Sequence, residues 1–165
     1  MRPLFKYKYY VIILAVAGFW LFLIMLPPLL VSLSIERSSL FLYFVFSPLC
    51  HQIAERSFFL RGYPLPVCSR CFGVYSGLLL GILIFPLIRG NKYMKVIDRR
   101  YLFIAAFPIM ADVILMSLGI YPSNRWTRFF SGLGFGSILA FFALPAFFQM
   151  TFLLLRRGGI RNLLR

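Results

Sequence analysis

Four stretches of the chain are almost continuously apolar: residues 10–33, 72–88, 101–119 and 129–155. A bilayer core needs about 20 mainly apolar residues per helix, and each stretch is close to that length or longer. Pro27 and Pro28 are expected to end or bend the first helix, and Pro145 to kink the last. The pattern therefore predicts about four transmembrane helices.

The loop between the first two predicted spans, residues 34–71, contains a shorter apolar run at 40–50. That run is too short to cross a bilayer, so we expect an interfacial or re-entrant segment packed against the bundle. No internal repeat is visible. Residues 1–165 are expected to form a single membrane domain.

The composition agrees with a membrane location. Hydrophobic residues make up 61% of the chain and charged residues only 13%, whereas an average soluble domain has about 25% charged residues. Soluble globular, disordered and coiled-coil classes are therefore excluded. The expected fold is an all-α integral membrane protein, a bundle of about four transmembrane helices with an external metal- or thiol-bearing loop.

The distribution of basic residues predicts the orientation. Twelve of the 18 Lys and Arg residues lie near the N-terminus, in 89–100 or near the C-terminus, and six lie in the other loops. Because basic loops stay in the cytoplasm, a multi-pass protein of the cell membrane with both termini cytoplasmic is expected. The net charge of +14 then indicates contact with anionic lipids rather than nucleic acid. A cleaved signal peptide is the alternative for the N-terminus, but the first apolar run exceeds a signal peptide's hydrophobic region.

Glycines recur every fourth residue in the second predicted span, at Gly73, Gly77 and Gly81. Small residues at this spacing allow two helices in lipid to approach closely. The fourth span begins with Ser131, Gly132, Gly134 and Gly136, which makes it the expected partner. Packing within the chain is favoured, and a homodimer seam is the alternative.

The three cysteines and the one histidine of the chain fall within the external loop, as Cys50-His51 and Cys68-Ser-Arg-Cys71. This spacing predicts a Cys3His site for Zn2+ or another transition metal. Since Cys50 and His51 are adjacent, both can bind only in irregular backbone. A disulfide or redox-active thiols, and inert buried thiols, remain as alternatives.

Asp112 is a carboxylate within a predicted span, which by default indicates a functional site. Asn124 and Arg128 follow on the same predicted side of the membrane, and Arg56 and Arg61 lie in the cysteine loop. Asp112, Asn124, Arg128 and Arg56 are the candidate catalytic residues. An ion pair of Asp112 with Arg128 or Arg125 is the structural alternative.

The motif residues resemble the signature C-H-Q…R-S…C-x-R-C-x-G of a family of small prokaryotic membrane proteins catalogued as a domain of unknown function. The resemblance covers roughly residues 45 to 140. It rests first on Cys50-His51-Gln52, Arg56-Ser57, Gly62, Pro66-Val67-Cys68, Arg70-Cys71 and Gly73, and then on Asp112, Gly119, Ser123, Asn124, Arg128 and Gly132. It implies a shared architecture and supplies no activity.

Three functions are compatible with these residues. The first is a membrane protein with a metal site beside a polar pocket whose arginines suit an anionic lipid headgroup or small molecule. The second is a thiol–disulfide oxidoreductase that uses the C-x-x-C pair. The third is a small transporter with Asp112 as its ion site.

Overall fold

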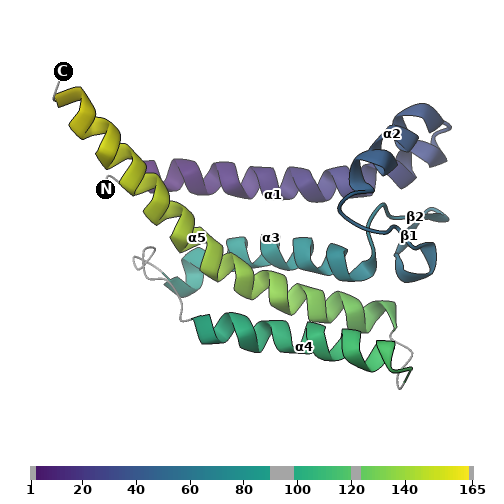
Figure 1. Cartoon of the computed structure of the whole chain (residues 1–165). Helices are drawn as coiled ribbons and strands as arrows, with labels where there is room; N and C mark the ends of the chain where they lie inside the picture. Colours follow the sequence, from purple (N-terminus) through teal and green to yellow (C-terminus); the bar gives the residue numbers. More distant parts are fainter. Residues whose placement is uncertain (1–2, 90–98, 120–123, 164–165) are drawn as a thin grey trace.

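The computed structural model describes residues 3–89, 99–119 and 124–163, which form five α-helices, one 3-10 turn and a small β-hairpin. Figure 1 shows α1, α3, α4 and the first part of α5 side by side, with α2 and the hairpin at one end, while the last part of α5 slants away from the other helices toward the C-terminus. The elements are α1 (Pro3–Ser32), α2 (Glu36–Phe46), the 3-10 turn η1 (Ala54–Arg56), β1 (Phe59–Leu60), β2 (Tyr63–Pro64), α3 (Ser69–Arg89), α4 (Arg99–Ser117) and α5 (Arg125–Leu163).

Three of the described helices are long and apolar enough to cross a membrane. The qualifying segments are Lys8–Ser32 of α1, Ser69–Ile88 of α3 and Arg125–Thr151 of α5, while the apolar part of α4, Ala106–Leu115, is shorter. Large apolar side chains cover the outer faces of these helices, as lipid contact requires. The predicted all-α membrane fold is confirmed, and the third predicted span, at 101–119, corresponds to α4, whose apolar part covers only some of that range.

The helix α1 does not end at its two prolines. It continues through Pro27 and Pro28 to Ser32, so of the two expected effects the prolines do not end the helix. The hydroxyl of buried Ser39, on α2, donates a 2.9 Å hydrogen bond to the Pro27 carbonyl oxygen. This bond joins α2 to α1 at the level of the two prolines. The chain turns only at Ser34, which has a φ of 62°.

The glycine face of α3 packs against α5, as predicted. A Cβ atom on Gly73 or Gly77 would collide with the backbone of Phe129 or Leu133, and one on Gly81 would lie 2.6 Å from the Ser137 carbonyl oxygen. In the other direction, Gly132 and Gly136 of α5 face the backbone of α3, whereas Gly134 has open space around it. The two helices therefore run parallel and in backbone contact, and we call this contact the glycine seam.

The loop between α1 and α3 is folded onto the end of the helices. Phe46, at the end of α2, packs edge-on against Trp20 of α1 with ring centroids 5.5 Å apart. Ile24, Phe46, Leu65 and Val67 form one buried cluster with Cys50. The expected segment packed against the bundle is thus the helix α2. The loop forms a compact cap whose apolar core includes a cysteine.

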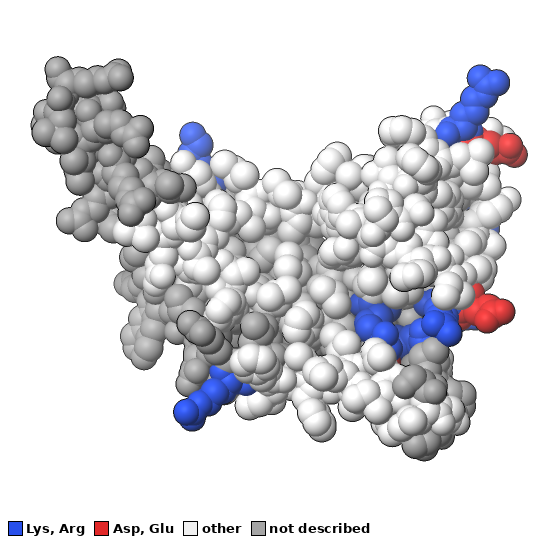
Figure 2. All heavy atoms as spheres, in the orientation of Figure 1, with Lys and Arg blue, Asp and Glu red and all other residues white. Residues whose placement is uncertain are grey.

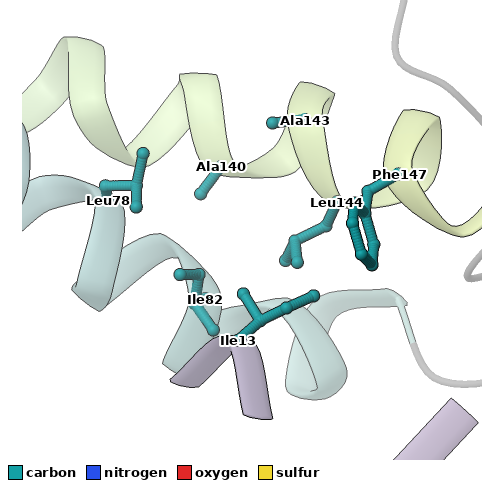
Figure 3. Close-up of a pocket in the computed structure, with 7 residues that line it drawn as sticks. All are labelled: Ile13, Leu78, Ile82, Ala140, Ala143, Leu144 and Phe147. Atoms are coloured by element: carbon teal, nitrogen blue, oxygen red, sulfur yellow. The ribbon is translucent and has the colours of Figure 1, made fainter. Parts of the chain in front are cut away.

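A second buried cluster lies further along the helices, where α1, α3 and α5 meet. Beside it is an apolar recess of about 180 Å³, lined by Ile13 from α1, by Leu78 and Ile82 from α3 and by residues of α5 (Figure 3). This recess contains no polar side chain. The chemistry of the described chain is therefore concentrated at the other end, beneath the cap.

Candidate functional site

Two segments far apart in sequence bring the three cysteines together. Cys50 follows α2, and its N–H donates a 3.2 Å hydrogen bond to the Phe46 carbonyl oxygen, so it extends the last turn of that helix. Cys68 and Cys71 flank the start of α3, where the Phe72 N–H donates to the Cys68 carbonyl oxygen at 2.9 Å. All three sulfur atoms lie within 4.8 Å of one another. We call this group the thiol cluster.

The cysteines of the thiol cluster are free, and one of them is activated. Hydrogen bonds from the Cys68 and Cys71 thiols, and from the backbone N–H groups of Gln52 and Cys68, hold the pKa of Cys50 well below its usual value. The Cys68 N–H lies 3.2 Å from the Cys50 sulfur. Thiolates are the form that binds metals and attacks disulfides. The lowered pKa favours the thiolate form at Cys50.

His51 is exposed and lies outside the group of three sulfur atoms. It lines one recess together with the three cysteines. The backbone around it is irregular: Gln52 has a φ of 51°, and its side-chain amide donates a 2.6 Å hydrogen bond to the Tyr43 carbonyl oxygen. Of the four predicted ligands, the three cysteines therefore lie together, and the histidine lies at the edge of the thiol cluster. His51 remains a predicted ligand.

Asp112 of α4 forms an ion pair with Arg70, in the first turn of α3. Their side chains are 11% and 22% exposed. Sequence reasoning did not name this partner, because it placed the carboxylate opposite the arginines of α5. Arg125 instead donates from Nε to the Glu55 carbonyl oxygen at 3.2 Å and lies over the Phe59 ring.

Three arginines meet beside the thiol cluster. Arg56 from η1, Arg70 from α3 and Arg128 from α5 line a recess of about 330 Å³ that Cys50, Cys68 and Cys71 also line. Arg128 is only 6% exposed and interacts electrostatically with Arg70, Arg56 and Asp112. Figure 2 shows Lys and Arg side chains gathered in a hollow near the cap. We call this space the arginine recess.

Other residues of the predicted pocket lie outside its lining. Asn124 is exposed just before α5, where its carbonyl oxygen accepts hydrogen bonds from Thr127 and from the Arg128 N–H. Arg61 is exposed on the hairpin and donates to the Ser32 hydroxyl at 3.3 Å. Ser123 falls outside the described residues. Of the predicted polar residues, Arg56 and Arg128 therefore line the recess directly, and Asp112 is linked to it through Arg70.

Comparison with known proteins finds relatives along most of the chain. The uncharacterized protein MJ1492 of Methanocaldococcus jannaschii is 36% identical over 150 residues, which cover 88% of this chain and 96% of the relative. An uncharacterized protein of Methanothermobacter thermautotrophicus is 35% identical over 95 residues, 58% of this chain and 84% of the relative. No solved structure matches.

A family described as predicted membrane protein (DUF2085) matches residues 50–142. The matched region begins at the first cysteine of the thiol cluster. It includes α3, α4 and the part of α5 that carries Arg128 and the glycine seam. The chain therefore belongs to the predicted membrane protein family DUF2085.

Proposed function

We propose that the thiol cluster binds one transition metal ion of the zinc class at the outer face of a multi-pass membrane protein. The observation that carries this proposal is the position of the three sulfur atoms within 4.8 Å of one another. In a tetrahedral zinc site with Zn–S bonds of about 2.3 Å, the sulfur atoms lie about 3.8 Å apart. Small side-chain rotations are enough to reach that spacing.

The cysteines would link the cap to the helices through the bound ion. Cys50 belongs to the segment after α2, and Cys68 and Cys71 belong to the start of α3. An ion bound by all three would fix the intervening loop against α3. Structural zinc contributes about 10–16 kcal/mol of apparent binding energy in small peptides. An ion here would therefore stabilise the cap against α3.

The fourth ligand decides what kind of site this is. If His51 rotates inward, four protein ligands close the site and its role is structural. If His51 stays at the edge, the fourth position opens into the arginine recess and accepts water or a solute atom. The position of His51 in irregular backbone supports a side chain that reaches the cluster after a local adjustment.

Metal analysis of the detergent-purified protein tests the proposal. We expect about one zinc-class ion per chain, and X-ray absorption should show three sulfur neighbours. Cys68→Ser should lose most of the metal and open the cap to protease, whereas Ser38→Ala, an exposed change on α2, should do neither. His51→Ala distinguishes the two kinds of site: metal occupancy should fall if His51 closes the site and stay unchanged if the fourth position is open. The proposal would be contradicted by a protein that contains no metal and whose three thiols react equally before and after a chelator is added.

A thiol–disulfide function is the second candidate, because the C-x-x-C pair and Cys50 lie within reach of one another. In that reaction Cys68 and Cys71 would lose two protons and two electrons to a substrate disulfide, which would leave as two thiols. Free-thiol counts after treatment with glutathione disulfide distinguish the candidates. Loss of two thiols in a protein that carries no metal would favour the redox function.

A topology of four spans with both termini in the cytoplasm is part of the same proposal. It is supported by the excess of basic residues on one side of the sequence pattern. The first turns of α1 and the last turns of α5 also lie at the same end of the molecule, opposite the cap (Figure 1). With that orientation, the thiol cluster and the arginine recess face the external side.

A further inference from the structure

The geometry points to a second ligand: a phosphate-bearing anion held in the arginine recess by Arg56, Arg70 and Arg128. The recess measures about 330 Å³, enough for a phosphate group and part of the molecule to which it is esterified. This inference goes beyond the proposed metal site and does not require the ion.

The charge balance of the recess favours an anion. Its described lining contains three arginines and no Asp or Glu. The neighbouring carboxylate of Asp112 is paired with Arg70. Three guanidinium groups against the Asp112 carboxylate and the thiolate favoured at Cys50 leave a net positive charge in the recess. Like charges in a poorly solvated space repel one another unless a counter-charge joins them.

One hydrogen-bond donor at this position is unused. The buried Nε of Arg70 has no hydrogen-bond partner among the described residues. A buried polar nitrogen without a partner costs free energy, and a guanidinium fork is suited to bind two oxygen atoms of one phosphate. Arg128, at 6% exposure, places a second guanidinium in the same shielded space. These two buried groups give the recess the character of a formed site rather than of a solvated basic surface.

The helix geometry adds to the positive potential. Both α3 and α5 begin at this end of the molecule, at Ser69 and Arg125. The N-terminus of a helix carries a partial positive charge and binds phosphate in many proteins. Because the glycine seam aligns the two helices in parallel, their N-termini lie together beside the recess.

A phosphate group suits this site better than a carboxylate. Three guanidinium groups line the recess, and a phosphate monoester offers three oxygen acceptors to them. A carboxylate brings one negative charge and two oxygen atoms. The ligand class is therefore a phosphate monoester or free phosphate, either dissolved or on a lipid headgroup.

Arg56 provides the cleanest test, because it lies exposed at the end of η1. Its backbone is fixed by the Ser69 hydroxyl, which donates a 2.9 Å hydrogen bond to the Arg56 carbonyl oxygen. Replacing its side chain removes one guanidinium from the recess without disturbing a buried contact. Arg37, exposed on α2, offers a matched control with the same change in net charge.

The experiment measures binding to the detergent-solubilised protein by calorimetry with three probes: inorganic phosphate, short-chain phosphatidic acid and acetate. We expect saturable binding of phosphate or phosphatidic acid and much weaker binding of acetate. Arg56→Gln and Arg128→Gln should each weaken it by about tenfold or more, as the loss of a charged hydrogen bond does. Arg37→Gln should leave it unchanged.

The outcomes separate the two sources of phosphate. Binding of inorganic phosphate indicates a dissolved ligand, and binding of phosphatidic acid alone indicates a lipid headgroup. If neither binds, or if Arg56→Gln and Arg37→Gln have equal affinity, the inference is wrong, even where Arg128→Gln fails to fold. Cys68→Ser should lose metal and still bind the anion, so failure of the metal proposal and failure of this inference give different results.

Discussion

The glycine seam makes a quantitative prediction in which the sign of the effect depends on position. Gly77→Ala adds one methyl group to α3 where α5 passes. That Cβ would lie 2.8 Å from both the Cα and the carbonyl carbon of Leu133, and closer still to its oxygen. An ordinary carbon–carbon contact is about 3.5–4.0 Å, so the two helices must separate by about 1 Å.

The cost follows from that separation. A gap of up to 1 Å loses about a quarter to a half of the dispersion attraction between facing atoms, and overpacking of a tight contact costs about 1–3 kcal/mol. Alanine recovers about 1 kcal/mol of helix propensity relative to glycine. We therefore expect Gly77→Ala to destabilise the protein by up to about 2 kcal/mol after this offset.

The control is the same substitution on the facing helix. Gly134 of α5 has no atom within 4 Å of the position of an added Cβ, so Gly134→Ala should gain helix propensity and lose nothing. Thermal unfolding in one detergent, followed by circular dichroism, should show a midpoint lowered by several degrees for Gly77→Ala and unchanged or raised for Gly134→Ala. Equal midpoints for the two variants would refute the packing of α3 on α5 by this face.

Three further predictions concern the site and the topology. Asp112→Asn should destabilise the protein by about 1–3 kcal/mol, because it leaves the Arg70 charge partly buried without its partner; Glu36→Gln, on the exposed start of α2, should have no effect in the same denaturation assay. At neutral pH, zinc binding should release about two protons rather than three, because the lowered pKa of Cys50 means that its proton has already left. Calorimetry in buffers of different ionisation enthalpy measures this number, and release of three would contradict the thiolate at Cys50. A reporter fused after Arg165 should be active only in the cytoplasm, and activity outside would reverse the proposed orientation.

Features that depend on local spacing could be predicted from the sequence. The interval of four between Gly73, Gly77 and Gly81 places them on one helix face whatever the rest of the chain does. The two residues between Cys68 and Cys71 likewise bring both thiols to one side of a helix start. These patterns are set by helix geometry, so the glycine seam and the C-x-x-C half of the thiol cluster were accessible before the fold was known.

Features that depend on how distant segments meet could not be predicted. Asp112 has several arginines within reach on sequence grounds, and its pairing with Arg70 is set by how α4 lies against the start of α3. The hydrogen bond from the Ser39 hydroxyl to the Pro27 carbonyl oxygen is likewise set by how α2 folds back against α1. Such contacts depend on how the helices pack against one another, and no spacing of residues within a single sequence indicates them.

The glycine seam also connects stability to ligand binding. The backbone of Arg70 rests against Gly132 at one end of the seam, and Arg128 lies one turn before that glycine. The spacing of the two helices therefore sets the distance between two like charges. Anion binding and the contact of α3 with α5 are therefore thermodynamically linked. If the contact favours binding of an anion that bridges these arginines, the bound anion strengthens the contact by the same free energy. The stability of the purified protein would then depend on its buffer. Phosphate should raise the unfolding midpoint, and an uncharged buffer adjusted to the same ionic strength should leave the midpoint lower.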